Sequence, residues 1–507
     1  MSINKLKLFL KPRKRPELLR RSELEELVRS IIEETKTIPI KPVNPVEQYS
    51  IDDEVFITIS NRNGILEYVV SEPRYDDRTI YAVTKIYLIN PRCKDLACIQ
   101  EVVAGSNDEE LYDAFNQQPL SIAYYYKKVA SGYGALYPLI RDPYIEEIAG
   151  SAEDERFSVI HRRYSWYGWM NTNIAISYGS MDRIVLSLAR KTGRHLSLAH
   201  PVVEGLTEEG LRISLTYGRE VSRKGSSLVI RKKPPTPWTI TKLIDAKALS
   251  SLMAAYLWLI MELRGAILIV GGVSSGKTTM LQALLTLIPP SRRVVTIEDT
   301  PEITGTTGYW DPLVERVVSI GESSSIDMYS LLKFSLRRRA DYLVVGEVRG
   351  VEARLLVQAS RLGHGILATM HAENAESAIE RLVAPPISIP KNMLSNIWCI
   401  VVMESDHGVR RVKGIYEVDK RVRIHRVFYH RGSGLFEPSD PSSVAESSHR
   451  LRNVLDPEDA INELVSRTVF LEKMVSNGVL EFNMLSEELG KFYYDIVESE
   501  VLRENAS

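Results

Sequence analysis

The sequence predicts an α/β fold for the second half of the chain and a separate α+β domain before it. In the second half, short apolar segments alternate with helical patterns, which is typical of a parallel sheet buried on both faces. These segments are Ala266–Val270, Val294–Ile297, Tyr342–Val345 and Ile366–Met370. In the first half, β-branched and aromatic runs are bounded by turn residues, which is typical of strands. A chain of 507 residues is too long for one ordinary domain, so we expect two or three.

A proline-rich segment, Lys233-Pro-Pro-Thr-Pro-Trp, predicts the boundary between the two halves, because proline stiffens the chain and removes backbone donors. We therefore divide the chain into a basic arm and helix (1–40), an α+β domain (41–232), a linker (233–245), an α/β domain (246–430) and a helical C-terminal extension (431–507). Whether the α+β domain splits into two subdomains near residue 130 is left open.

The N-terminal arm is strongly basic. Lys5–Arg21 carries eight basic side chains and one acid, with leucines interleaved. Such a segment serves either as a membrane- or partner-docking element or as a solvated arm, and the sequence does not choose between them. Glu23–Glu34 has the pattern of a short amphipathic helix.

The α+β domain is expected to begin with a hairpin. Val55–Ile59 and Thr79–Leu88 are rich in β-branched and aromatic residues and predict strands, and Asn63-Gly64 is a hairpin signal. A second small sheet is predicted from three segments, followed by a helix at Met181–Thr192 and a strand pair. The segments are Tyr137–Ile148, Arg156–Arg163 and Asn173–Ser177, and the strand pair is Leu211–Leu215 with Ser227–Arg231.

Composition excludes some classes of protein. The net charge is −1, which argues neither for nor against a nucleic-acid partner. Three cysteines are too few for a disulfide framework and no C-x-x-C pair offers a zinc site, so we expect reduced cysteines and a cytoplasmic location. The N-terminus lacks a signal-peptide pattern, and the most apolar stretch, Leu252–Leu263, is shorter than a membrane span.

A phosphate-binding loop is predicted between the first apolar strand and the next helix. Gly271–Thr278 reads Gly-Gly-Val-Ser-Ser-Gly-Lys-Thr and matches G-x-x-x-x-G-K-[ST]. Glycines let successive N–H groups converge on phosphate oxygens, and the helix that follows adds its positive end. We expect Gly271, Gly272, Val273, Ser274, Ser275, Gly276, Lys277, Thr278 and Thr279 to bind ATP, with Lys277 on the phosphates and the Thr278 hydroxyl on Mg²⁺.

Polar side chains follow three of the predicted strands, at what would be one edge of the sheet. Glu347 ends the strand Tyr342–Val345 and is predicted to polarise the attacking water. Glu298 and Asp299 follow Val294–Ile297; they would tune Mg²⁺ or water, or else cap the next turn. His371 ends the third strand, where an imidazole could contact the γ-phosphate.

Together these four segments resemble the secretion ATPase superfamily that powers type II secretion, type IV pilus assembly and the archaeal archaellum. Gly271–Thr278 is similar to its Walker A motif, Val294–Glu302 to its Asp box, Asp341–Gly350 to its Walker B motif and Gly363–His371 to its His box. Pro138–Ile148, His161–Tyr164, Pro201–Arg212 and Gly225–Arg231 resemble the N-terminal domain of archaeal members. The resemblance implies a RecA-like motor domain joined by a flexible linker to its N-terminal domain.

The resemblance also implies further site residues and partners. Arg212, Arg231, Arg337 and Arg381 stand at positions where members carry arginines that reach phosphates when domains or subunits close. Such cations compensate the charge of the transferring phosphoryl group; otherwise each would be an arginine in a surface salt bridge. The family further implies a homo-hexamer, peripheral at the inner face of the cell membrane, that docks on a polytopic membrane platform protein, with no nucleic acid expected.

The chain departs from the family pattern at several points. Ser274 replaces a Walker A glycine, Ala340 replaces a proline before Walker B, and the tetracysteine zinc module of bacterial members is absent. Residues 1–130 and those beyond about 430 lie outside the resemblance. Three alternatives stay open: a conjugation-type DNA-transfer or pilus-retraction ATPase, a nucleotide-gated scaffold, and a helicase-like translocase.

Overall fold

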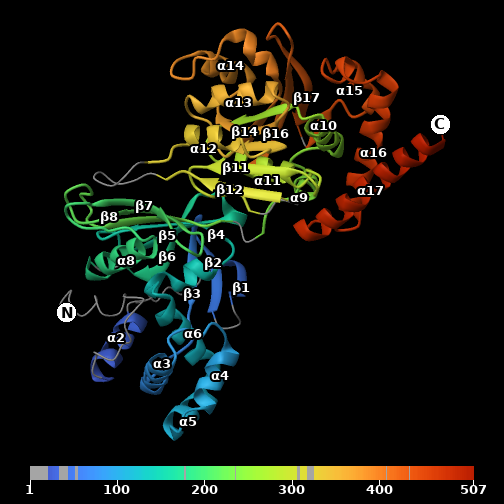
Figure 1. Cartoon of the computed structure of the whole chain (residues 1–507). Helices are drawn as coiled ribbons and strands as arrows, with labels where there is room; N and C mark the ends of the chain where they lie inside the picture. Colours follow the sequence, from blue (N-terminus) through green and yellow to red (C-terminus); the bar gives the residue numbers. More distant parts are fainter. Residues whose placement is uncertain are drawn as a thin grey trace. The chain divides into compact units, whose positions relative to one another are not determined.

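A computed structural model describes residues 21–33, 44–51, 55–175, 178–233, 236–304, 309–316, 325–406, 408–432 and 434–506. The chain forms two compact units, Met1–Pro235 and Thr236–Ser507 (Figure 1). The basic arm Lys5–Arg20 and the linker prolines Pro234 and Pro235 lie outside the described residues. The five-part division of the chain and the role of the arm therefore stay predictions.

Unit 1 is built on one nine-stranded sheet with the order β1-β2-β3-β6-β5-β4-β9-β8-β7. Its strands are β1 (Pro45–Ile51), β2 (Val55–Arg62), β3 (Ile65–Ser71), β4 (Ile145–Ser151), β5 (Arg156–His161), β6 (Trp169–Ala175), β7 (Val202–Leu206), β8 (Arg212–Thr216) and β9 (Ser227–Arg231). The expectation of two separate sheets was wrong, because β3 pairs in parallel with β6 and joins them. The hairpin at Asn63-Gly64 is confirmed by the antiparallel pairing of β2 with β3.

The helices of unit 1 are α2 (Arg21–Glu33), α3 (Asp77–Ile89), α4 (Leu96–Ala104), α5 (Glu109–Gln117), α6 (Pro119–Ser131), α7 (Tyr137–Arg141) and α8 (Tyr178–Lys191). The prediction of a strand at Thr79–Leu88 was wrong, since this segment lies within α3. Asp76 and Thr79 form a reciprocal capping box at its start, and buried Ile80, Val83 and Ile86 recur every three residues. Local capping and helical burial thus override β propensity.

The prediction that Tyr137–Ile148 belongs to a sheet holds only for its end. The segment begins as helix α7 and becomes strand β4 from Ile145. Between the two lies Asp142, whose carboxylate accepts hydrogen bonds from Tyr49 Oη at 2.5 Å and from Tyr68 Oη at 2.6 Å. Asp142 is fully buried, so these hydroxyls satisfy a carboxylate that would otherwise be costly in the core.

Unit 2 has the predicted α/β architecture, and the RecA-like fold class is confirmed. Its sheet has the order β12-β11-β13-β14-β10-β15-β16-β17-β18, with parallel strands from β12 to β15 and antiparallel strands after them. The strands are β10 (Ala266–Gly271), β11 (Arg293–Glu298), β12 (Tyr309–Val314), β13 (Tyr342–Val345), β14 (Gly365–His371), β15 (Ile397–Asp406), β16 (Val409–Val418), β17 (Ile424–Gly432) and β18 (Leu435–Glu437).

Helices cover both faces of this sheet. They are α9 (Ile240–Asp245), α10 (Ser251–Glu262), α11 (Lys277–Leu285), α12 (Met328–Ser335), α13 (Glu352–Arg361), α14 (Ala375–Val383), α15 (Pro441–Ser447), α16 (Pro457–Ser476) and α17 (Phe482–Ala506). Alternate residues of β10 show the two layers: Ile267 and Ile269 pack with α9 to α11, α16 and α17, whereas Leu268 and Val270 pack with α12 to α14. Helix α10 begins at Ser251, because Ser250 caps it and Lys247, just before, has a left-handed φ of 56°.

The C-terminal segment is fastened to the sheet through a buried carboxylate. Glu417, near the end of β16, is fully buried. It accepts hydrogen bonds from Tyr256 Oη at 2.5 Å, Ser448 Oγ at 2.5 Å, and the backbone N–H groups of His449 at 2.7 Å and Arg450 at 3.1 Å. Helix α16 then packs along α10, where the buried Arg467 contacts Glu262 at 2.7 Å.

Two cysteines differ from expectation. Cys93 and Cys98 are joined by a disulfide, whereas Cys399 is a buried free thiol. The expectation that all cysteines are reduced was therefore wrong for this pair, which lies only five residues apart at the start of α4. No helix in the described part of the chain is both long enough and apolar enough to cross a bilayer.

Candidate functional site

The glycine loop joins β10 to α11, as its motif predicts, and its backbone requires small residues. A Cβ on Gly271 would lie 2.4 Å from Ser275 Oγ and 2.8 Å from the Met403 carbonyl oxygen. Gly276 has a φ of 93°, a conformation that only glycine adopts readily. Ser274, which replaces the family glycine, has a left-handed φ of 57°. The loop therefore keeps its tight course although one glycine has been replaced.

The loop ends with Lys277, the first residue of α11. Its Nζ donates to the carbonyl oxygens of Gly271 at 3.1 Å and Gly272 at 2.7 Å. Burial lowers the pKa of Lys277, and the nearby charge of Glu347 acts in the opposite direction. The ammonium group is thus held over the loop and lies within the electrostatic reach of the predicted catalytic acid.

His371 lies next to the glycine loop. It ends β14, and its register partner on β10 is Gly271. Its side chain is exposed, and its carbonyl oxygen accepts a hydrogen bond of 2.7 Å from Nη1 of Arg381, which comes from α14. The structure therefore brings His371 and Arg381 to the edge of the sheet that carries the glycine loop.

Glu347 follows β13 at the same edge and pairs with Arg349, whose Nη2 lies 2.5 Å from its Oε2. Burial of Glu347 opposes ionisation, but the hydrogen bond and charge of Arg349, together with the charges of Lys277 and His371, lower its pKa. The carboxyl group is therefore ionised at neutral pH. Arg349 also lies 3.6 Å from Asp299, so it bridges the two acids.

The two acids at the end of β11 have different surroundings. Glu298 is buried, and its Oε1 accepts from the backbone N–H groups of Glu302 at 2.8 Å and Ile303 at 2.9 Å. Asp299 is less buried and faces Arg349. Glu298 thus has the capping role that was the structural alternative for this pair, whereas Asp299 lies beside Arg349, the partner of Glu347.

The remaining predicted arginines lie elsewhere. Arg337 is exposed at the end of α12. Arg212 on β8 and Arg231 on β9 are direct register partners in unit 1, and the next strand brings Glu147 to 4.0 Å from Arg231. Arg231 thus has the surface salt bridge that was the structural alternative for these arginines, and the like charge of Arg212 lies directly opposite it.

Sequence reasoning missed Arg349. The signal was present in the pattern Gly-Glu-Val-Arg, because a side chain two residues after Glu347 can fold back on it when the strand has ended. Arg349 orients the carboxylate in the structure, which makes it the most direct neighbour of the predicted base.

The residues of the glycine loop and of the first turn of α11 suit a nucleoside triphosphate with Mg²⁺. The glycine loop leads into α11, whose first turn has no side-chain cap, and Thr278 and Thr279 are partly exposed there. In the described part of the chain, no group of three or more His, Cys, Asp or Glu side chains forms a metal cage. The Thr278 hydroxyl, at the start of α11, is the group that would hold Mg²⁺ together with phosphate oxygens.

Comparison with known proteins decides the family. A profile described as "Type II/IV secretion system protein" matches residues 213–413. The chain is 33% identical over 389 residues to Uncharacterized protein MJ0900 of Methanocaldococcus jannaschii, covering 73% of this chain and 69% of that protein. The chain belongs to the type II/IV secretion ATPase superfamily.

Other members are similar over shorter stretches. Uncharacterized protein MJ1287 of the same organism is 41% identical over 244 residues, which cover 46% of this chain and 90% of that protein. Conjugal transfer protein TrbB of Rhizobium radiobacter is 30% identical over 204 residues, which cover 38% of this chain and 61% of that protein. The glycine loop and the strand ends Glu298, Glu347 and His371 all fall within the matched range of the family profile.

Proposed function

We propose that this chain is a Mg²⁺-dependent ATPase and that it works as a hexameric motor. Its task would be to drive assembly of a type IV pilus-like filament, an archaellum or a secretion system at the cytoplasmic face of the membrane. The observation that supports this best is the gathering of Lys277, Glu347 and His371 at one sheet edge, with mutual influence of their charges.

Each side chain has a chemical task in this proposal. Lys277 would bind the β- and γ-phosphates, and the ionised Glu347 would orient and polarise the attacking water. Arg349 would hold the Glu347 carboxylate, while Asp299 would tune the same region. His371 would sense the γ-phosphate, and Arg381 would fix the strand end that carries it.

Arg212, Arg231 and Arg337 would complete the site only on closure of domains or neighbouring subunits. Cations delivered in this way stabilise charge on the transferring phosphoryl group and couple hydrolysis to movement. The paired arrangement of Arg212 and Arg231 on adjacent strands supports a shared target of high negative charge. A polytopic platform protein would receive the movement.

The experiment that tests this function measures ATP turnover by the purified full chain with Mg²⁺ and with EDTA. Turnover that requires Mg²⁺ supports the ATPase. ATP binding without turnover would instead favour a nucleotide-gated scaffold. Recovery of a polytopic membrane protein with the tagged chain supports the motor at a membrane platform.

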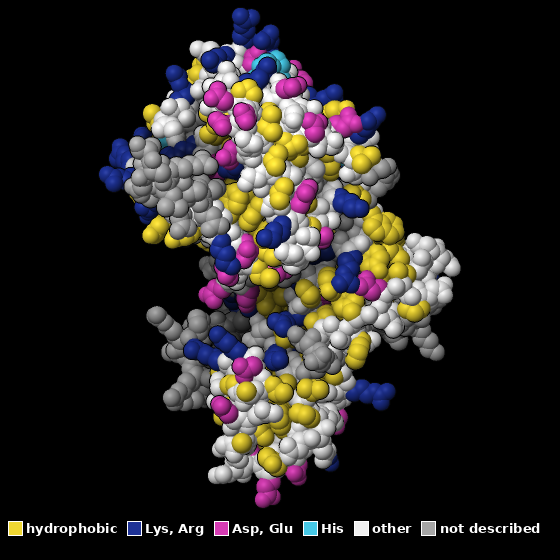
Figure 2. All heavy atoms as spheres, turned by 90° about the vertical axis from the view of Figure 1, so that its right-hand side faces the viewer, with side chains coloured by type: hydrophobic (Ala, Val, Ile, Leu, Met, Phe, Trp, Pro, Cys, Tyr) yellow, Lys and Arg dark blue, Asp and Glu magenta, His cyan; other side chains and the backbone are white. Residues whose placement is uncertain are grey.

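A second candidate function, DNA transfer, is favoured by the similarity to Conjugal transfer protein TrbB. Against it, acidic and basic side chains are intermingled on the face drawn in Figure 2, rather than separated into a basic groove. Addition of single- and double-stranded DNA to the ATPase assay separates the two: stimulation favours transfer, and an unchanged rate favours filament assembly or export.

A further inference from the structure

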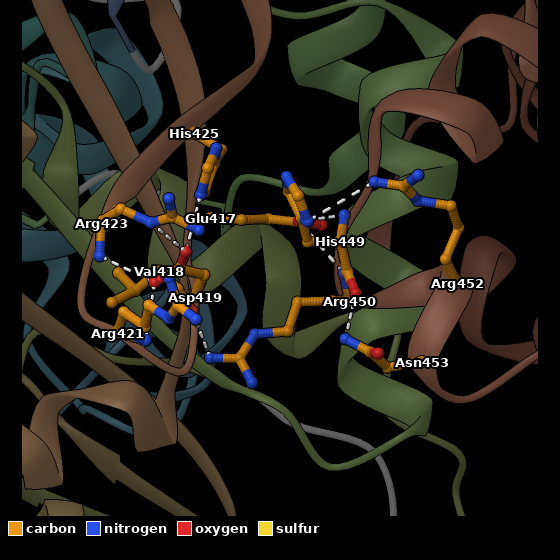
Figure 3. Close-up of polar contacts among 10 residues, drawn as sticks. All are labelled: Glu417, Val418, Asp419, Arg421, Arg423, His425, His449, Arg450, Arg452 and Asn453. Carbon is orange, nitrogen blue, oxygen red and sulfur yellow. Dashed lines mark hydrogen bonds and ion pairs between the residues drawn. The ribbon is translucent and has the colours of Figure 1, made fainter.

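A basic hollow lies between the β16–β17 turn and the segment that follows α15. Its volume is about 320 Å³, and it is lined by Asp419, Lys420, Arg421, Arg423, His449, Arg450 and Asn453. Figure 3 shows all of these residues except Lys420. Four of these seven side chains are permanently cationic and one is anionic. None of them belongs to the nucleotide site described above.

The single acid in the hollow is already engaged. Asp419 accepts from the backbone N–H groups of Arg421 and Arg423, both at 2.8 Å, from Arg423 Nε at 2.7 Å and from His425 Nε2 at 3.0 Å. These bonds lower the pKa of Asp419 far below its ordinary value. Its negative charge therefore offsets Arg423 and shapes the turn, and it does not neutralise the remaining cations.

Two of the remaining cations have no acidic partner within the described residues. Neither Lys420 nor Arg421 makes an ion pair with any residue that the structure describes, and both are exposed on the turn. Nη2 of Arg450 donates hydrogen bonds to the carbonyl oxygens of Ser395 at 2.6 Å, Ile397 at 3.0 Å and Val418 at 2.5 Å. Its buried Nε has no hydrogen-bond partner among the described residues. Lys420 and Arg421 thus leave positive charge unneutralised on one side of the hollow, while on the other side the charge of Arg450 is partly offset by the nearby Glu417.

The turn between β16 and β17 has a strained backbone, which hydrogen bonds to Asp419 maintain. Val422 has a φ of 60°, which is unfavourable for a β-branched residue, and its N–H donates to the Asp419 carbonyl oxygen at 3.0 Å. Strained backbone of this kind occurs preferentially at binding sites, where the surrounding structure maintains it. Here the bonds to Asp419 maintain a turn that presents Lys420 and Arg421 together.

The hollow is far from the nucleotide loop. Residue Arg410 at the start of β16 lies against Gly276, whereas Asp419 follows the other end of that strand. Ten residues of strand separate the two ends by about 30 Å. The contacts of Arg450 with Ser395 and Ile397 at the start of β15 confirm that the hollow lies at the edge of the sheet opposite the glycine loop.

We propose that this hollow is a second anion site that binds a phosphate-bearing ligand, either a soluble polyphosphate or the headgroup of an anionic lipid. Guanidinium groups recognise phosphate by paired N–H donors. Several cations around one hollow attract a ligand with a multiply charged phosphate more strongly than a ligand with a single carboxylate. Because the walls come from the sheet and from the C-terminal segment, an occupant would bridge the two.

Calorimetric titration with inorganic pyrophosphate tests the proposal directly. It is done on the full chain carrying Lys277→Ala, which weakens phosphate binding at the glycine loop equally in every variant compared. Adding Lys420→Ala and Arg421→Ala should weaken binding about tenfold or more, because two charged donors are lost. Lys413→Ala, which removes an exposed charge from β16 outside the hollow, should change affinity less than about twofold. An unchanged circular dichroism spectrum excludes loss of fold at these exposed positions.

The source of the phosphate is settled by co-sedimentation with phosphatidylcholine vesicles containing 20% phosphatidic acid. Loss of sedimentation in the double variant, but not in Lys413→Ala, identifies a lipid headgroup. Pyrophosphate binding with unchanged sedimentation identifies a soluble ligand. Equal pyrophosphate affinity and equal sedimentation in all variants overturn the site. A hexaglutamate peptide is titrated as a carboxylate control. The site is also overturned if the double variant loses affinity for this peptide but not for pyrophosphate. Either result leaves the ATPase proposal untouched.

Discussion

The carboxylate of Glu417 provides the clearest quantitative prediction about what holds unit 2 together. Replacing Glu417 with Gln keeps the size of the side chain but exchanges one acceptor oxygen for an NH₂ donor. Each oxygen now accepts two bonds, Oε1 from Tyr256 and Ser448, and Oε2 from the N–H groups of His449 and Arg450. If the NH₂ group faces the two backbone N–H groups, they lose their acceptor. If it faces Tyr256 and Ser448, two hydrogen bonds to a charged oxygen are replaced by weaker bonds to neutral hydroxyls.

The expected loss follows from those two bonds. Hydrogen bonds to a charged group contribute on the order of 1.5–3 kcal/mol each, so the buried site should lose roughly 3–6 kcal/mol. This loss acts locally, because the bonds join the 448–450 segment to the sheet. We expect peptides covering residues 441–455 to lose protection in hydrogen exchange before the central strands do.

Glu446→Gln is the matched control, since Glu446 is exposed on α15. It should leave hydrogen exchange and the thermal unfolding midpoint unchanged within error. Protection of residues 441–455 that is the same in Glu417→Gln as in the parent chain would refute the role assigned to the buried carboxylate.

Three further predictions concern the nucleotide site. Because Arg349 lowers the pKa of Glu347, Arg349→Ala should raise that pKa, and the acid limb of the kcat/KM profile should move to higher pH; an unshifted limb contradicts the pairing. Gly276→Ala should destabilise the nucleotide-free chain by about 1–2 kcal/mol through its left-handed φ, whereas Gly272→Ala, with open space around its Cα and no positive φ, should cost less than about 0.5 kcal/mol in thermal unfolding. Arg212→Ala should spare nucleotide binding and depress turnover, and an equal loss of both would show that the residue acts in binding.

Much of unit 2 was predictable because its local signals agree. Strands buried on both faces leave continuous apolar runs, and a glycine loop between strand and helix leaves a short motif. The shared edge of Glu347 and His371 followed from parallel strand direction alone. The pairing of Gly271 with His371 shows that this inference from direction was sound.

Unit 1 was less predictable because its decisive interactions join residues far apart in sequence. Thr79–Leu88 has strand-like composition, yet the capping box at Asp76 and burial against α6 make it helical. The pairing of β3 with β6 connects segments about a hundred residues apart, and no local sequence pattern predicts such a pairing. Glu298 likewise could not be separated from Asp299 until the backbone of Glu302 and Ile303 was placed around it.

The most direct test of the catalytic arrangement compares ATP binding with ATP turnover in one variant. Glu347→Gln preserves the shape of the side chain but removes the charge that would polarise water, so ATP affinity should stay within about threefold while Mg²⁺-dependent turnover falls by about a hundredfold or more. Glu373→Gln, an exposed change two residues beyond His371, should leave both quantities unaltered. Turnover by Glu347→Gln at the parent rate would contradict the account.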